Sequence, residues 1–93
     1  MILAYLLDNC YYSQEAFHLL KNNHIPFQYI QVPQDEKIKS KFKKKNKMNT
    51  FPQLFLNTKK IGGYDDLIKY FEIIDQIKVK KLNKDVLLYM LQK

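Results

Sequence analysis

The first strongly patterned stretch of the chain is an uninterrupted apolar run over residues 2–7. Such a run is typical of a strand that is covered on both faces, which is usually a central, parallel strand. A second strand is predicted over residues 27–32, where apolar and polar positions partly alternate between Pro26 and Pro33. The first third of the chain therefore predicts two strands.

Apolar residues recur with helical spacing between these strands and after them. Residues 13–22 predict an amphipathic helix, and its apolar side comprises Ala16, Phe17, Leu19 and Leu20. Glu15 would lie in the first turn of this helix, where a negative charge suits the helix dipole. Residues 34–46 predict a more polar helix, which acidic side chains open and lysines close.

Two further helices are expected in the last third of the chain. The first starts at Asp65 or Asp66, either of which can cap it, and runs to about Ile77. The second is short and follows Asn83. Its apolar side comprises Val86, Leu87, Met90 and Leu91.

A hairpin completes the set of predicted elements. Residues 53–56 predict a third strand, and the turn-like residues 57–60 followed by Ile61 predict a fourth strand paired with it. The order is therefore β-α-β-α-β-β-α-α. Because a strand–helix–strand start implies a parallel pair with a right-handed crossover, we expect an α/β fold. It would have a mixed four-stranded sheet with helices on both faces, in a single domain over residues 1–93.

The charge of the chain is strongly positive and comes from lysine alone. The chain has sixteen lysines, no arginine and nine acidic residues, which gives a net charge of +7. Seven of these lysines fall between Lys37 and Lys47. A basic tract can bind nucleic acid. The lack of arginine and the presence of one aromatic residue in the tract, Phe42, instead favour a solvated helix face, and nucleic-acid binding is not expected.

Cys10 is the only cysteine, and it lies where the first strand gives way to the first helix. A thiol at a helix N-terminus meets unpaired backbone N–H groups and the positive end of the helix dipole, and both favour the reactive thiolate. A small, buried and unreactive residue is the alternative interpretation. With no internal disulfide, no signal peptide and an apolar start too short to span a membrane, we expect a cytoplasmic protein.

Three motifs resemble those of the glutaredoxin family, whose members have the thioredoxin fold. Residues 10–13, Cys-Tyr-Tyr-Ser, are similar to the family's Cys-x-Tyr-Cys/Ser active site. Residues 50–52, Thr-Phe-Pro, resemble its Thr-Val-Pro segment, which carries a cis-proline. Residues 62–66, Gly-Gly-Tyr-Asp-Asp, resemble its Gly-Gly-x-Ser/Thr-Asp segment at the start of the third helix. The likeness spans essentially the whole chain and implies a single thioredoxin-like, glutaredoxin-like domain.

The resemblance implies a glutathione-dependent thiol–disulfide oxidoreductase. Cys10 would be its nucleophile and, because Ser13 replaces the second cysteine, would act by a monothiol mechanism on glutathionylated proteins. The main chain of Phe51 would hold the cysteine part of glutathione, and the start of the third helix its γ-glutamyl end. The implied glutathione-binding residues are Tyr12, Thr50, Phe51, Pro52, Gly63, Tyr64, Asp65 and Asp66. Glutathione is then the co-substrate, and glutathionylated proteins are the partners.

Two departures from the family pattern bear on activity. Leu7 stands where the family usually has lysine or arginine, which favours the thiolate and meets the glycyl carboxylate of glutathione. Activity is therefore expected to be weak unless another lysine substitutes, and Lys47 is the first candidate. Tyr11 replaces the usual proline and places a bulky ring beside the thiol.

Two alternatives to an oxidoreductase remain open. Some Cys-x-x-Ser relatives hold a [2Fe–2S] cluster between two protomers, and Cys10 would then be a ligand together with glutathione. The other alternative is a degenerate binding module without turnover. No further metal site is expected, and the chain should be a monomer unless a cluster joins two copies.

Overall fold

The computed structural model describes residues 1–73 of the chain. The predicted end of the third helix and the predicted helix after Asn83 lie outside the described residues. The elements are β1 (Ile2–Leu7), α1 (Tyr11–Asn22), β2 (Phe27–Val32), α2 (Glu36–Asn46), β3 (Gln53–Leu56) and β4 (Lys59–Gly62). A helix over residues 64–73 follows β4.

The four strands form one mixed sheet in the order β2-β1-β3-β4. β1 and β2 are parallel, with Leu7 opposite Val32 at one end of the pair. β3 runs antiparallel to β1, with Gln53 opposite Tyr5, and β4 returns antiparallel to β3. The predicted central parallel strand and the predicted antiparallel hairpin are both confirmed.

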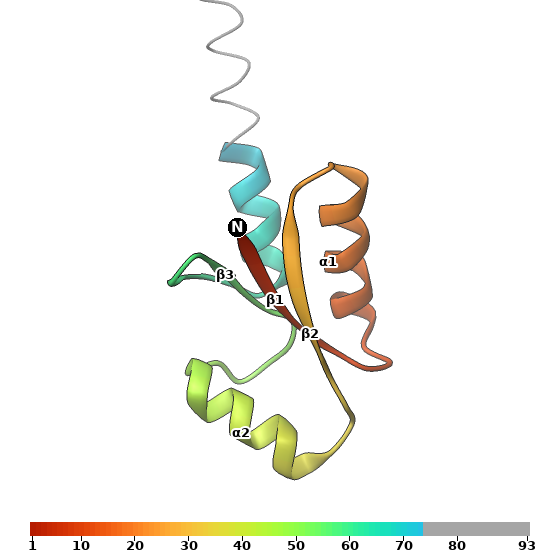
Figure 1. Ribbon diagram of the computed structural model, residues 1–93, viewed down its shortest axis with the longest axis vertical. Coiled ribbons are helices and arrows are strands. Elements are labelled where there is room, and N and C mark those ends of the chain that lie inside the picture. Colours follow the sequence, from red (N-terminus) through yellow and green to blue (C-terminus); the bar gives the residue numbers. More distant parts are fainter. Residues whose placement is uncertain (74–93) are drawn as a thin grey trace, which may run out of the picture.

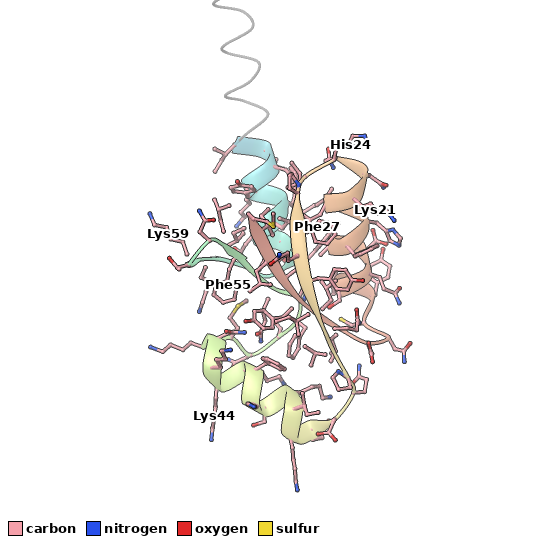
Figure 2. The ribbon with its side chains drawn as sticks, viewed as in Figure 1. Lys21, His24, Phe27, Lys44, Phe55 and Lys59 are labelled. Atoms are coloured by element: carbon pink, nitrogen blue, oxygen red, sulfur yellow. The ribbon has the colours of Figure 1, made fainter. Side chains whose placement is uncertain are left out.

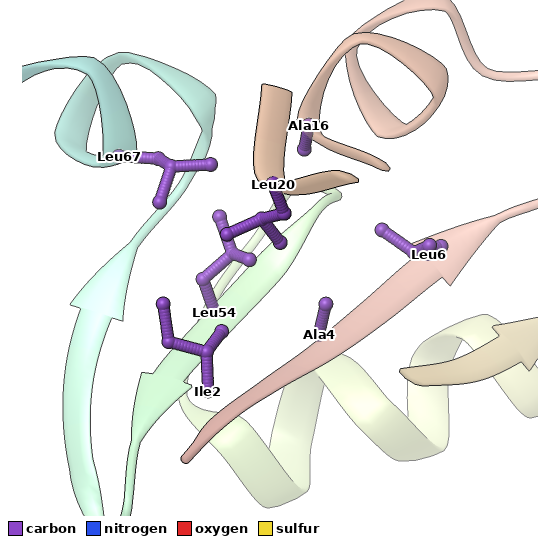
Figure 3. Packing of buried hydrophobic residues seen from close by; sticks show 7 residues of the cluster. All are labelled: Ile2, Ala4, Leu6, Ala16, Leu20, Leu54 and Leu67. Carbon is purple, nitrogen blue, oxygen red and sulfur yellow. The ribbon is translucent and has the colours of Figure 1, made fainter. Parts of the chain in front are cut away.

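Helices cover both faces of this sheet, as predicted (Figure 1). On one face, shown in Figure 3, side chains from β1, β3, α1 and the helix over residues 64–73 form the larger core cluster. Its buried members are Ile2, Ala4, Leu6, Ala16, Leu20, Leu54 and Leu67. Each fully buried leucine there stabilises the fold by about 1.5–3 kcal/mol.

The opposite face of the sheet is covered by α2. Tyr5, Val32 and Phe51 are buried there, and the Phe42 ring of α2 lies 5.2 Å from the Tyr5 ring, measured between centroids. Successive side chains of a strand point to opposite faces. β1 therefore contributes to both clusters, which explains its uninterrupted apolar run.

Two helices begin at residues other than those predicted. α1 begins at Tyr11, before the predicted start at Ser13, so Glu15 does not lie in its first turn. The apolar pattern concealed this start because Tyr11 and Tyr12 are 65% and 55% exposed and add nothing to the core. α2 begins after Asp35. The Asp35 side chain accepts a hydrogen bond from the backbone N–H of Ile38, the third residue of the helix, at a distance of 3.0 Å.

Candidate active site

The sheet topology brings the three motif segments to one end of the sheet. The chain leaves β1 towards Cys10 at this end. Because β3 runs antiparallel to β1, Pro52 precedes β3 at the same end. β4 runs antiparallel to β3 in turn, so Gly62 closes β4 there as well. Residues that lie more than fifty positions apart in the sequence are thus neighbours.

A groove of about 380 Å³ opens between these segments. Its lining combines residues from the start of α1, the approach to β3 and the start of the helix over residues 64–73. They are Tyr12, Met48, Thr50, Phe51, Gly63, Tyr64, Asp65 and Asp66. The structure therefore gathers seven of the eight predicted glutathione-binding residues around one groove, whereas Pro52 is buried and does not line it. Met48 was missed, since nothing in its own sequence context marks it.

Cys10 is a half-buried free thiol at the N-cap position of α1. Its backbone is extended, with φ −111° and ψ 121°, and its carbonyl accepts the first helical hydrogen bond from the N–H of Gln14 at 3.0 Å. Its side chain makes no capping hydrogen bond, so the sulfur is not engaged by the helix end. Cys10 does not line the groove itself but precedes Tyr12, which does. Along the chain, Cys10 is therefore two residues away from the lining of the groove.

Ser13 has a structural role that the sequence motif did not reveal. It is only 1% exposed, and its hydroxyl accepts a hydrogen bond from the backbone N–H of Leu7 at 3.0 Å. This bond fastens the first turn of α1 to the end of β1, so it fixes the loop that carries Cys10. Ser13, the fourth residue of the motif, thus contributes to the site by holding the backbone of this loop in place.

We expect Ser13→Ala to lower the free energy of unfolding by about 1–2 kcal/mol, because the buried N–H of Leu7 loses its partner. Urea denaturation followed by circular dichroism measures this change. Ser40→Ala is the matched control, since Ser40 is exposed on α2, in another element than the loop that carries Cys10. Equal stability of the two variants would contradict the structural role of Ser13.

Three tyrosine rings lie against one another, and two of them, Tyr12 and Tyr64, line the groove. The Tyr12 ring lies 5.4 Å from the Tyr11 ring and 5.7 Å from the Tyr64 ring, measured between centroids. Burial raises the pKa of Tyr64, and the negative charge of Glu15 nearby adds to the effect. The Tyr64 hydroxyl therefore stays protonated and uncharged at neutral pH.

The double glycine shapes the start of the helix over residues 64–73. Gly62 has a φ of +125°, and a Cβ atom at this position would collide with the carboxylate of Asp66. That carboxylate accepts a hydrogen bond from the backbone N–H of Gly63 at 3.0 Å, as in one half of a capping box. The prediction that Asp65 or Asp66 would be the N-cap residue is wrong, because the helix begins at residue 64 and both lie in its first turn.

The first turn of this helix presents free backbone donors beside the groove. The first hydrogen bond of the helix runs from the N–H of Leu67 to the carbonyl of Gly63, at 3.0 Å. Within the described part of the chain, the N–H groups of Tyr64, Asp65 and Asp66 therefore have no helical acceptor. Together with the helix dipole they give this end of the groove a partial positive charge.

Phe51 contributes to the groove mainly through its backbone. Its side chain is only 8% exposed and packs in the core cluster on the α2 side. The peptide bond between Phe51 and Pro52 is cis. Among residues 1–73, no hydrogen bond occupies the main-chain N–H or C=O of Phe51. These two groups form a short open edge of the kind that pairs with an extended peptide.

The groove contains no lysine side chain among its lining residues. Leu7 is half-buried against the core cluster on the α2 side, as an apolar residue should be. Lys47, the first candidate for a replacement cation, is exposed just after α2 and is not part of the lining. Neither Leu7 nor Lys47 therefore supplies a positive charge to the lining of the groove.

A second cavity, of about 470 Å³, lies between α1 and β2. Asn9 and Ser13 line it from the cysteine loop, and Tyr29 and Gln31 line it from β2. It is larger than the groove, but its lining contains neither the open edge of Phe51 nor the start of the helix over residues 64–73. The smaller groove therefore fits a peptide-like ligand better.

Residues 1–73 contain neither a membrane-spanning helix nor a cluster of metal-ligating side chains. No helix there is long and apolar enough to cross a lipid bilayer. No group of three or more histidine, cysteine, aspartate or glutamate side chains there is arranged to hold a metal ion.

The chain is similar to known proteins over most of its described length. A model of the glutaredoxin family matches residues 2–61. "Glutaredoxin 1" of Rickettsia bellii is 37% identical over an alignment of 70 residues, and the match covers 71% of each chain. "Monothiol glutaredoxin-S14, chloroplastic" of Arabidopsis thaliana is 29% identical over 63 residues, or 68% of this chain, but the match spans only 36% of that protein.

The fold likeness is equally clear. The crystal structure of glutaredoxin 1 from Francisella tularensis, complexed with cacodylate, superposes with a TM-score of 0.71 at 25% identity. The match covers 81% of this chain and 95% of that one. Together with the element order and the groove beside Cys10, these matches show that the chain belongs to the glutaredoxin family and has the thioredoxin fold.

Proposed function

We propose that this chain is a glutathione-dependent thiol–disulfide oxidoreductase that removes glutathione from glutathionylated proteins through Cys10 alone. One observation carries the proposal. A single groove at the end of the sheet unites the open main-chain edge of Phe51 with the free N–H groups of the helix over residues 64–73, and Cys10 lies two residues before Tyr12 of its lining.

The exchange needs one nucleophilic sulfur and no second cysteine. The Cys10 thiolate attacks the glutathione sulfur of the mixed disulfide, a new sulfur–sulfur bond forms, and the protein leaves as its thiolate. The thiolate of a second glutathione then attacks the glutathione sulfur bound to Cys10. Glutathione disulfide departs and the Cys10 thiolate is restored. Ser13 cannot compete for the intermediate, because it has no thiol and its hydroxyl is occupied by the N–H of Leu7.

The groove offers a partner for most parts of glutathione. The N–H and C=O of Phe51 suit the cysteinyl part, which is an extended peptide unit. The free N–H groups of Tyr64 and Asp65 suit the γ-glutamyl carboxylate. The carboxylate of Asp66 suits the ammonium group next to it. The glycyl carboxylate meets no lysine in the groove, so we propose weaker binding than in relatives with a basic residue at position 7.

Asp66→Asn should raise the KM for glutathione about two- to fivefold and leave kcat within about twofold, because an exposed charge pair contributes up to about 1 kcal/mol. Asparagine keeps an oxygen for the N–H of Gly63, so the helix start should persist. Glu72→Gln is the control, since it removes the same charge from an exposed site on the same helix, away from the lining. An equal change in KM for both variants would mean that Asp66 does not contact glutathione.

The assay for the proposed function follows release of glutathione from a glutathionylated peptide in the presence of glutathione, glutathione reductase and NADPH. We expect turnover that saturates with the peptide and yields one glutathione disulfide for each peptide thiol released. Folded protein that binds the peptide without turnover would refute the proposal and favour a degenerate binding module.

The described residues fit a [2Fe–2S] cluster poorly. Cys10 is the only cysteine of the chain, so a second protomer would have to bring its own thiolate close to the first. The rings of Tyr11 and Tyr12 stand exposed beside Cys10, in the path of such an approach. After anaerobic incubation with iron, sulfide and glutathione we expect a colourless monomer by absorbance and size-exclusion chromatography. A coloured dimer would contradict this expectation.

A further inference from the structure

We infer that the exposed lysines of α2 and of its C-cap form a docking surface for the acidic face of protein substrates. We call this surface the lysine face, and it consists of Lys37, Lys41, Lys44, Lys45 and Lys47. The inference rests on the proposed function and extends it, because it assigns the site a class of protein partner.

The lysine face follows from the helical spacing of α2. Lys37, Lys41 and Lys44 are separated by four and three residues, which places them along one side of the helix. Phe42 lies on the opposite side and packs against the sheet. Figure 2 shows Lys44 directed away from the body of the molecule. The charges therefore point towards any partner that approaches α2.

Among residues 1–73, no ion pair neutralises a lysine of this face. The one ion pair between described residues joins Lys39 to Glu36 at 2.8 Å, and it involves no member of the lysine face. Lys60 adds a further positive charge nearby, since its ammonium group donates to the main-chain carbonyl of Lys47 at 3.0 Å. The surface thus holds several adjacent positive charges that a partner can neutralise.

The lysine face is continuous with the groove beside Cys10. α2 ends at Asn46, and Lys47 follows it as the C-cap with a left-handed backbone, φ 54°. The next residue, Met48, donates from its N–H to the carbonyl of Lys43 at 3.0 Å and also lines the groove. A protein held on the lysine face therefore reaches the edge of the groove where its mixed disulfide must react.

The chemistry of the face favours an acidic protein over a nucleic acid. The only aromatic residue in the tract is Phe42, and its ring packs against Tyr5, so it cannot stack on bases. No arginine is present to bind phosphates or base edges in a bidentate manner. Lysine ammonium groups pair with carboxylates in many geometries. Charges at the rim of an interface chiefly raise the rate of association.

The test compares kcat/KM of this chain with three substrates. They are a glutathionylated acidic protein, a glutathionylated basic protein and a small neutral disulfide of glutathione. For the variant Lys41→Gln/Lys44→Gln we expect kcat/KM at low salt to fall about fivefold with the acidic protein and less than about twofold with the other two. The control Lys21→Gln/Lys69→Gln removes the same charge outside the lysine face. It should change kcat/KM for each of the three substrates less than about twofold.

Salt supplies a second readout for the same inference. For the unmodified chain, raising the salt from about 20 to about 200 mM should lower kcat/KM for the acidic protein several-fold and affect the small disulfide little. The inference would be overturned if kcat/KM fell equally with all three substrates. It would also be overturned if the control Lys21→Gln/Lys69→Gln had the same effect as Lys41→Gln/Lys44→Gln. Stronger inhibition by a single-stranded RNA than by an unmodified acidic protein would assign the face to nucleic acid instead.

Failure of the proposed function is distinguishable from failure of this inference. If the small disulfide is not turned over at all, the proposed function is wrong. Binding of the unmodified acidic protein to the chain and to the Lys41→Gln/Lys44→Gln variant, measured by calorimetry at low salt, still tests the lysine face. Equal affinity of the acidic protein for the unmodified chain and for the variant would overturn the inference.

Discussion

Cys10→Ser should lower the rate of release of glutathione from a glutathionylated peptide by at least about a thousandfold. A serine hydroxyl is a far weaker nucleophile than a thiolate, and the chain has no other cysteine to take its place. The coupled assay with glutathione reductase measures this loss directly. Mass spectrometry of the wild type during turnover should show one glutathione bound to Cys10, and the variant should show none.

The fold should not suffer from this substitution, so the loss can be attributed to chemistry. Cys10 is the N-cap of α1 and its side chain makes no capping hydrogen bond. Serine is a favourable N-cap residue, and thermal unfolding of Cys10→Ser should occur at an unchanged or slightly higher temperature. Activity retained by a well-folded Cys10→Ser protein would refute the assignment of the nucleophile.

Gly62→Ala should lower the free energy of unfolding by about 2–4 kcal/mol. Gly62 has a φ of +125°, a backbone conformation that residues other than glycine rarely adopt. An added Cβ would also collide with the carboxylate of Asp66. That carboxylate holds the N–H of Gly63, so relief of the clash would also disturb the helix start. Denaturation in urea measures the stability, and the KM for glutathione should rise as well.

Gly63→Ala is the matched control for this prediction. An added Cβ at Gly63 would meet only the carbonyl oxygen of Pro52, at an ordinary distance of 3.8 Å. We expect its stability to change by less than about 1 kcal/mol. Equal destabilisation by the two substitutions would show that the conformation of Gly62 is not what the site requires.

Much of the fold could be predicted from the sequence because its signals are local. The uninterrupted apolar run of β1 predicted a strand covered on both faces, and both core clusters draw on it. The prolines around β2 and the turn after β3 marked strand ends that the structure confirms. These signals depend on side chains close together in the sequence, so a single chain is enough to read them.

The remaining features depend on contacts between distant elements. The buried hydrogen bond of Ser13 needs the end of β1 next to α1, and no spacing rule predicts it. Met48 lines the groove only because the end of α2 lies beside it. The start of α1 was misplaced because two exposed tyrosines interrupt the apolar pattern. The positive φ of Gly62 was not predicted either, since only the backbone angles reveal it.

A structure of the chain with glutathione joined to Cys10 is the most direct measurement of where the ligand binds. We expect the cysteinyl part of glutathione to pair with the N–H and C=O of Phe51, and its γ-glutamyl carboxylate to lie at the N–H groups of Tyr64 and Asp65. Glutathione seated instead in the cavity between α1 and β2, against Tyr29, would contradict the proposed site.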